Sequence, residues 1–272
     1  MSGADRIFRA LFVFYLAGFA FYLFAPLVIM SAASFNESRF PTVIPWQGTT
    51  LDWFRAMWAD RAMWEALWTS AVVAFFVVVI SIPAGTAAAL VLTTLHARAR
   101  SFAYALMVSP LLTPGVVIGI ATLILWRQVG VGGGLLLIVI AQASFIICYV
   151  MLMVVARLQR FDRTQEEAAL GLGASRFMVF RRVLLPFLRP ALLASAGLAV
   201  LQSFENYNTT LFVRGFETPL TVFIATKVRT GLTPAVNALA LIMIAVTVIG
   251  AVAYELARRR RLRDNRAADL PH

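Results

Sequence analysis

The sequence predicts an all-α integral membrane protein with six transmembrane helices, and three observations lead to this fold class. The 272 residues are 61% hydrophobic and 14% charged, with a mean hydropathy of +0.82, outside the range of water-soluble domains. The chain contains runs of about 20 apolar residues, the length that a helix needs to cross about 30 Å of hydrocarbon. Its basic residues gather at the ends of these runs.

The apolar runs define the expected spans, which are residues 11–33, 67–92, 102–126, 135–155, 191–213 and 235–257. Residues 11–257 are therefore expected to form a transmembrane domain, between a short segment 1–10 and a basic tail 258–272. The first run has the alternative of a cleaved signal peptide. Its uncharged core, residues 11–30, is longer than a usual signal core, so we expect an anchor that is retained.

Orientation follows from the basic residues in alternate loops. With the N-terminus in the cytoplasm, 17 of the 24 lysines and arginines fall in cytoplasmic segments and seven fall outside. This asymmetry predicts that both termini are cytoplasmic. It also argues against a nucleic-acid-binding protein, which would carry a basic face on a soluble fold.

Prolines and glycines interrupt two of the expected spans. Pro83 and Gly85 lie in the second, and Pro110, Pro114 and Gly115 lie in the third. Such residues break a membrane helix only where protein or a water-filled cavity satisfies the freed backbone groups. The sequence leaves two interpretations open: these positions line a transport pathway, or they are kinks buried between helices.

Several kinds of chemistry lack the residues that they require. Cys148, His96 and His272 stand apart, so the sequence offers no disulfide framework and no zinc site. A phosphate-binding P-loop needs lysine followed by serine or threonine, whereas Lys227, the single lysine, precedes Val228. No cofactor is therefore expected in this chain, and any ATP and magnesium would be bound by another chain.

The loop 157–190, expected in the cytoplasm, carries the most informative pattern. Thr164 and Glu167 have the spacing of a capping box, which predicts that a short helix begins there. Gly171 and Gly173 permit the turn that follows.

A second short helix is expected after this turn. Ser175 can cap its N-terminus, Phe177 and two later apolar residues have helical spacing, and the helix should end before Pro186. Taken alone, this helix-turn-helix needs no partner, and Glu167 could simply cap its own helix.

The spacing of the loop residues resembles the EAA loop of ABC importer permeases, E-A-A-x3-G-x9-[I/V]-x-L-P. The matching residues are Glu167, Ala168, Ala169, Gly173, Val183, Leu185 and Pro186. The resemblance implies the type I ABC importer permease fold and a coupling helix that docks on a separate ATPase subunit. It assigns Glu167, Ala168, Ala169, Gly173 and Pro186 to this ATPase-coupling element.

Two later stretches, 203–215 and 228–239, resemble the corresponding parts of the PotC-like branch of spermidine/putrescine permeases. The resemblance implies a polyamine as substrate. Where that branch commonly has aspartates, this chain has Glu205 followed by the neutral Asn206. Aminoethylphosphonate and ferric iron, carried by relatives of the branch, remain alternative substrates.

Glu205 has a physical interpretation of its own, because it is an acid within an expected span. A lone charge at that depth is costly, so intramembrane acids usually face a cavity or a partner. A carboxylate beside Phe204, Asn206 and Tyr207 could attract ammonium groups by charge and by cation-π contact. We expect these four residues to line the substrate pathway. The alternative is a structural pair with an arginine or a site that faces a partner permease.

The resemblance also implies the partners. They are a second homologous permease, two copies of a cytoplasmic ATPase, and a periplasmic solute-binding protein. PotC-like chains usually pair with a permease that differs from themselves. A secondary transporter or channel is the main rival, but it would normally show several intramembrane ionisable groups or a filter motif. A membrane-embedded enzyme would need a metal cluster, an acid pair or a nucleophile with a base, so we expect a transport subunit without enzymatic activity.

Overall fold

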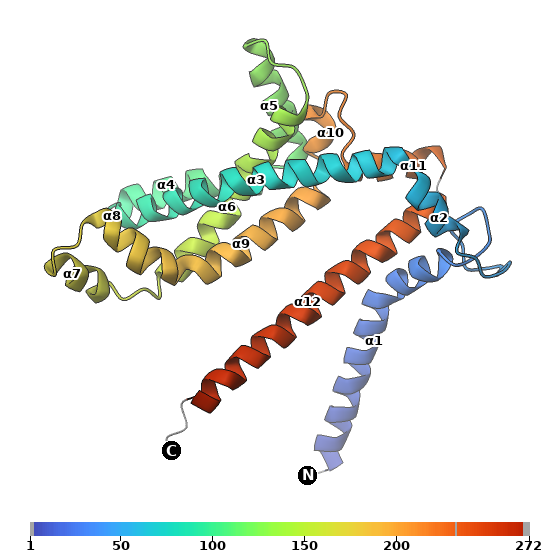
Figure 1. Ribbon diagram of the computed structural model, residues 1–272, viewed down its shortest axis with the longest axis horizontal. Helices are drawn as coiled ribbons and strands as arrows, with labels where there is room; N and C mark the ends of the chain where they lie inside the picture. Colours follow the sequence, from blue (N-terminus) through green and yellow to red (C-terminus); the bar gives the residue numbers. More distant parts are fainter. Residues whose placement is uncertain (1–2, 232, 269–272) are drawn as a thin grey trace. The chain divides into compact units, whose positions relative to one another are not determined.

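The computed structural model describes residues 3–231 and 233–268 (Figure 1). In this part of the chain the secondary structure is helical, with one isolated β-bridge between Asn36 and Thr49. The chain divides into two compact units. One combines the N-terminal segment up to Arg61 with the C-terminal segment from Thr226, and the other is Ala62–Ala225.

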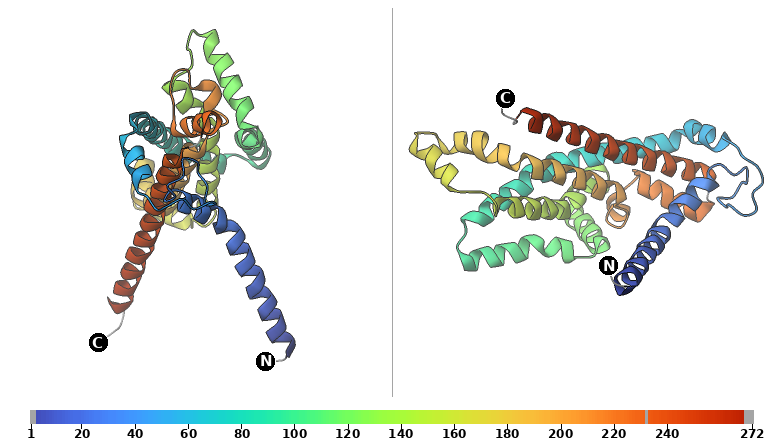
Figure 2. Two further views of the ribbon diagram at one scale, coloured as in Figure 1. Left: turned by 90° about the vertical axis from the view of Figure 1, so that its right-hand side faces the viewer. Right: turned by 90° about the horizontal axis from the view of Figure 1, so that it is seen from below.

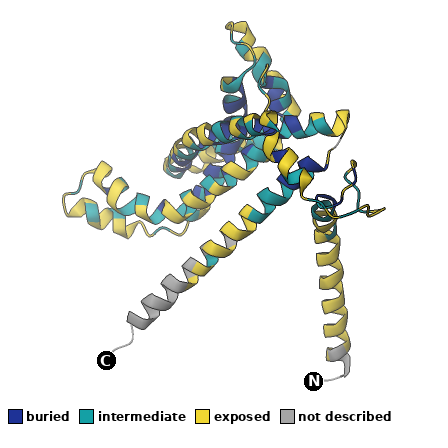
Figure 3. Ribbon diagram, turned by 45° about the vertical axis from the view of Figure 1, so that its right-hand side comes forward, coloured by how far each residue is buried: buried dark blue, intermediate teal, exposed yellow. Residues whose placement is uncertain are grey.

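The first unit contains α1 (Gly3–Ala33), α2 (Asp52–Ala59) and α12 (Pro234–Ala268), and α12 contacts both of the others. The apolar side chains of α1 are exposed along most of its length; Phe14, for example, is 79% exposed (Figure 3). Water would make this surface unfavourable, whereas lipid would not. The exposure of α1 is therefore what a membrane helix requires.

The segment between α1 and α2 is ordered by one buried side chain, Asn36. Its Nδ2 donates to the carbonyls of Thr42 (2.9 Å) and Pro45 (3.1 Å), and its Oδ1 accepts from the backbone N–H of Gln47 (2.9 Å). Its carbonyl accepts from the Trp53 indole at 2.7 Å. Asn36 thus replaces the hydrogen bonds that regular secondary structure would have supplied.

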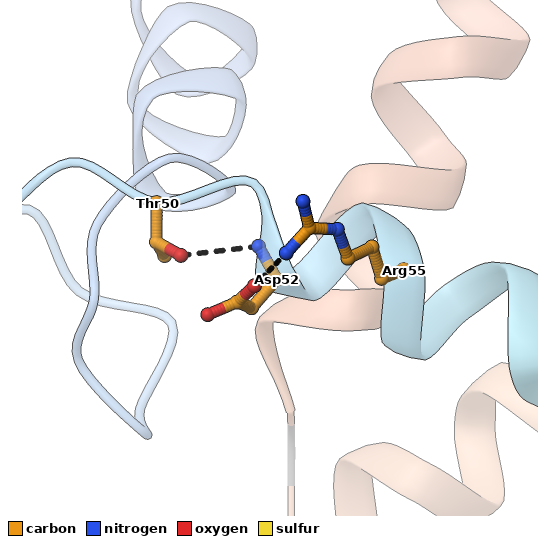
Figure 4. Close-up of polar contacts among 3 residues, drawn as sticks. All are labelled: Thr50, Asp52 and Arg55. Carbon is orange, nitrogen blue, oxygen red and sulfur yellow. Dashed lines mark hydrogen bonds and ion pairs between the residues drawn. The ribbon is translucent and has the colours of Figure 1, made fainter.

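At the start of α2 the hydrogen bonds are local (Figure 4). Thr50 Oγ1 accepts from the backbone N–H of Asp52 at 3.1 Å, and Arg55 contacts the Asp52 carboxylate at 2.9 Å. Both charged side chains are exposed, so this ion pair adds little stability.

The second unit is built around α6 (Leu135–Leu158), which contacts α4 (Ala97–Leu112), α5 (Gly115–Gln128), α9 (Leu185–Glu205) and α10 (Thr210–Val213). The remaining helices are α3 (Arg61–Thr94), α7 (Thr164–Gly171), α8 (Arg176–Val179), the π-helical η1 (Phe180–Leu184) and α11 (Leu220–Thr230). Figure 2 gives two further views of their course. Many α6 side chains are fully buried, so this helix is the core of the unit.

The α3 helix remains unbroken despite Pro83. Gly85 faces α6, where a Cβ would lie 2.6 Å from Cβ of Val150 and 2.8 Å from the carbonyl oxygen of Ile147. Only glycine permits this approach. For Gly85 the structure therefore favours the interpretation of a residue buried between helices, whereas Pro83 is exposed.

Within the part of the chain that the structure describes, four helical stretches are long and apolar enough to cross a membrane: residues 7–33, 61–94, 135–158 and 176–205. The pair α4 and α5 meets the same criteria together, but it is bent by 102° at the break. In α12 the apolar part is Pro234–Gly250, which is shorter than these stretches. The third expected span is thus a broken helix.

Candidate functional site

Two helix breaks form the centre of the second unit. The expected span 191–213 is not one helix, because α9 ends at Glu205 and α10 begins only at Thr210. Asn206 is extended, with φ −72° and ψ 95°. The other break separates α4 from α5, where Pro114 has no N–H to continue the helix.

The two breaks touch each other through glycines on α5. A Cβ on Gly115 would lie 2.9 Å from Oγ1 of Thr209, and a Cβ on Gly119 would lie 2.7 Å from the Thr209 carbonyl oxygen. The second contact is with backbone, so it could not be relieved by turning a side chain. Gly119 in particular therefore allows the two broken helices to meet.

A buried polar network holds the break after α9. The side-chain oxygen of Gln142, on α6, accepts from Ser203 Oγ at 2.6 Å, and Gln142 Nε2 donates to Thr210 Oγ1 at 2.8 Å. The Thr210 backbone N–H and hydroxyl donate to Asn206 Oδ1 at 3.3 and 3.2 Å. These bonds satisfy buried side chains on both sides of the break, and Asn206 Oδ1 gives the Thr210 N–H the partner that a backbone carbonyl would supply in an unbroken helix.

A cavity of about 300 Å³, which we call the break cavity, lies between the two breaks. The lining residues are Pro110, Leu111, Thr113, Gly115, Ile118, Phe145, Tyr149, Gln202, Glu205, Asn206, Tyr207, Asn208 and Thr209. Three residues expected in the pathway, Glu205, Asn206 and Tyr207, are thus brought together. Phe204 is half-buried on α9 and is not among the lining residues.

Charge and hydrogen-bonding capacity in the break cavity are concentrated on few side chains. Gln202 Nε2 donates to Oε1 of Glu205 at 2.6 Å, and Glu205 is exposed. Phe145 and Tyr149 from α6 meet edge to face, with ring centroids 6.5 Å apart. Thr209 Oγ1 is fully buried and has no hydrogen-bond partner within residues 3–231 and 233–268. The cavity therefore combines a carboxylate with aromatic rings and neutral polar groups.

Phe145, Tyr149 and Thr209 were missed by sequence reasoning. The aromatic pair has the i,i+4 spacing of one helical face, but this spacing is equally that of core residues. Within the described residues, no group of three or more His, Cys, Asp or Glu side chains could hold a metal ion.

The predicted helix-turn-helix is present as α7 and α8, but the hydrogen bonds at the start of α7 differ from the prediction. The Thr164 side chain does not form a capping box, because the carboxylate of Asp162 instead accepts from both the backbone N–H (3.0 Å) and the hydroxyl of Thr164. These two hydrogen bonds lower the pKa of Asp162. Gly173 makes the turn with φ +85°, a conformation that favours glycine.

The second short helix begins as predicted, since Ser175 Oγ accepts from the N–H of Met178 at 3.2 Å. It does not end before Pro186. The helix continues through η1 into α9, with Pro186 in the first turn. Because proline lacks an N–H and crowds the carbonyl four residues earlier, it disfavours the normal α-helical pattern there, which accounts for the π-helical segment.

Glu167 and Ala168 are exposed and Ala169 is half-buried, so α7 presents these residues at the surface. The same surface carries apolar side chains; Leu172 is 90% and Phe177 is 71% exposed. Exposed apolar side chains such as these are unfavourable in water.

Comparison with known proteins identifies a family and similar permeases. Residues 81–263 match the family described as binding-protein-dependent transport system inner membrane component. The putrescine transport system permease protein PotI of Escherichia coli (strain K12) is 34% identical over 264 residues, covering 93% of each chain. The spermidine/putrescine transport system permease protein PotC of the same strain is 30% identical over 247 residues, covering 90% of this chain and 92% of PotC.

Solved structures show the same fold. A chain of a bacterial ABC transporter involved in the import of the acidic polysaccharide alginate aligns with a TM-score of 0.72 at 19% identity, covering 94% of this chain and 98% of that one. A chain of the MetNI methionine ABC transporter aligns with a TM-score of 0.55 at 20% identity, covering 76% and 97%. The fold, the family match and the similarity to the two permeases agree, and the chain belongs to the family of inner membrane components of binding-protein-dependent transport systems.

Proposed function

We propose that this chain is one permease subunit of an ATP-driven importer and that its substrate is a polyamine such as putrescine or spermidine. The observation that carries the substrate assignment is the Glu205 carboxylate in a cavity that also holds aromatic rings. The names of the permeases PotI and PotC, which resemble this chain over most of its length, support the same substrate class.

The break cavity suits a flexible cation for electrostatic reasons. Glu205 attracts an ammonium group, and Tyr149 and Tyr207 offer ring faces and hydroxyl acceptors to a second group or to the methylene chain. Among the described residues, the cavity lining contains no arginine or lysine, so none of them places a cation in the wall to compete for this carboxylate. Asn206 and Gln202 can accept hydrogen bonds without adding charge.

Energy is proposed to enter through α7. The exposed apolar side chains of Leu172 and Phe177, next to Glu167 and Ala168, suit a groove on a separate ATPase subunit, which would bind ATP and magnesium. The helical continuity from α8 through η1 into α9 supports a direct mechanical path from this contact to the break at Glu205. Motion of α7 would thus alter the break cavity.

The full assembly in this proposal has a second, different permease, two ATPase copies and a periplasmic binding protein. Six spans are proposed, namely α1, α3, the α4–α5 pair, α6, α9 with α10, and α12, with both termini in the cytoplasm and the protein in the inner membrane. The basic residues at the cytoplasmic ends support this orientation.

The test is uptake of labelled putrescine and spermidine in the native host, with its other polyamine uptake systems deleted. Deleting this gene should abolish uptake, and the wild-type gene should restore it. Glu205→Gln should restore much less uptake at an equal amount of protein in the membrane, because it removes the charge and keeps the shape. Glu217→Gln, the same change outside the break cavity, should restore uptake fully. Undiminished uptake in the deletion strain would refute the polyamine assignment.

A further inference from the structure

A second cavity, of about 590 Å³, is lined by residues where α3 ends, α4 begins and α6 ends. The end of α3 and the start of α4 lie at the left of Figure 1. Its apolar wall includes Leu92, Val155 and Leu158, and Tyr104 adds an aromatic ring. The break cavity shares none of these residues. We call this second space the basic-end cavity, because two arginines line it.

The two arginines are Arg100 and Arg163. Arg100 Nε and Nη2 donate to the carbonyls of Leu92 (3.0 Å) and Thr93 (3.2 Å), which fixes its guanidinium beside the end of α3. A guanidinium has five N–H donors, so the remaining ones can bind a ligand. Arg163, the residue before α7, is the second arginine that lines the cavity.

The balance of charge in the basic-end cavity is positive. The other polar residues in its lining, Thr93, Ser101 and Gln159, are neutral, and the described lining residues include no carboxylate. Asp162 is adjacent in sequence to Arg163, but its carboxylate accepts from the backbone N–H and the hydroxyl of Thr164. The cavity therefore favours a ligand with a negative group and an apolar part.

The outer surface of α4 beside this cavity is apolar. Phe102 is 74% and Leu106 is 63% exposed; Phe102 comes just after the basic first turn of the helix, and Leu106 lies about one turn further on. A membrane helix places such a surface in lipid, with the basic turn at the level of the headgroups. The basic-end cavity therefore lies beside a helix surface that suits lipid.

We propose that the basic-end cavity binds an anionic phospholipid. Its phosphate contacts Arg100 and Arg163, since guanidinium groups bind phosphate through paired hydrogen bonds. One acyl chain lies along Leu92, Val155 and Leu158. The proposal requires only that the chain lies in a membrane, as its family does, and it is independent of the substrate.

The test is native mass spectrometry of the full-length protein, purified in detergent and titrated with phosphatidylglycerol or phosphatidylcholine. Wild type should retain phosphatidylglycerol at least about tenfold more tightly than phosphatidylcholine. Arg163→Gln should lose most of this preference. Arg189→Gln, the same change of charge outside the cavity, should keep it.

Two further measurements separate the headgroup from the acyl chain. Leu158→Trp fills the apolar part without changing charge and should also weaken retention of phosphatidylglycerol. Inorganic phosphate and glycerol phosphate should compete poorly, since they have no acyl chain. Equal retention of the two lipids would overturn the proposal. So would unchanged binding of phosphatidylglycerol by both Arg163→Gln and Leu158→Trp, or its displacement by free phosphate at low concentration.

Discussion

Replacing Gln142 by leucine should destabilise the protein more than an ordinary polar substitution within a helix. Gln142 is 2% exposed and bridges Ser203 on α9 and Thr210 on α10. Leucine has a similar volume, so the main effect is the loss of two buried hydrogen bonds. At about 1 kcal/mol for each bond, with up to about 2 kcal/mol more for a buried hydroxyl without a partner, the loss is about 2–4 kcal/mol. The lower value applies if Ser203 turns its hydroxyl to a carbonyl of its own helix.

A loss of this size is measurable by thermal denaturation in detergent. For a protein of this size, each kcal/mol corresponds to about 2–4 °C, so the midpoint should fall by about 4–16 °C. The assay heats a fluorescent fusion of the full chain and measures by size-exclusion chromatography the fraction that stays monodisperse. Ser144→Ala is the matched control on α6, because its hydroxyl bonds only within that helix.

The network also predicts coupling between its members. Gln142→Leu combined with Ser203→Ala should cost clearly less than the sum of the two single changes, because both remove the same hydrogen bond. A midpoint for Gln142→Leu within about 1 °C of wild type, or strict additivity in the double variant, would show that the network does not hold the break.

Three other changes test different parts of the structure. Gly119→Ala should lower polyamine uptake, because its Cβ would lie 2.7 Å from the Thr209 carbonyl oxygen and force the two breaks apart; Gly197→Ala, on open helix surface, is the control, and equal uptake by both would contradict the contact. Gly173→Leu should uncouple transport while leaving the amount of protein in the membrane unchanged, because φ +85° costs a non-glycine residue about 1–2 kcal/mol; uptake at the wild-type level would argue against a docking role. Asp162→Ala should lower protection of the first α7 amides against hydrogen exchange at pH 7. Since hydrogen bonds to Thr164 lower the pKa of Asp162, the wild-type contribution is complete above the ordinary value of 3.8 and is lost as pH falls through the lowered pKa; protection independent of pH across this range would refute the cap.

The prolines show that one sequence pattern can have two structural outcomes. Pro83 and the Pro110–Pro114 pair gave the same two alternatives, yet α3 is unbroken and α4 is separated from α5. Gly85 belongs to a helix–helix contact, whereas Gly115 lines a cavity. The difference depends on the neighbouring helix: α6 packs closely at Gly85, while the break after α9 lies opposite Gly115.

In the loop 157–190, by contrast, most features could be predicted from nearby residues. Ser175 and Gly173 act as predicted, because capping and positive φ are decided within a few residues. The helix starts at Thr164 as predicted, but the capping box was wrong: the Asp162 carboxylate accepts from the N–H and hydroxyl of Thr164, and the N–H of Glu167 donates to the carbonyl of Arg163. Capping and turn preferences thus predicted the helices of this loop, and a neighbouring polar residue decided how the start of α7 is capped.

The sequence alone determined that this chain is a helical membrane protein, because the length and apolarity of its runs leave the backbone few other ways to satisfy its hydrogen bonds in lipid. It also singled out Glu205, Asn206 and Tyr207. Only the tertiary structure decided that the helix ends there, since no proline or glycine lies between Gly197 and Gly215 to mark a break. Asn206 accepts from the Thr210 N–H within the break, while Gln142, 61 residues before Ser203, bonds to both sides of it from another helix, and such a contact between distant residues leaves no local signal in the sequence.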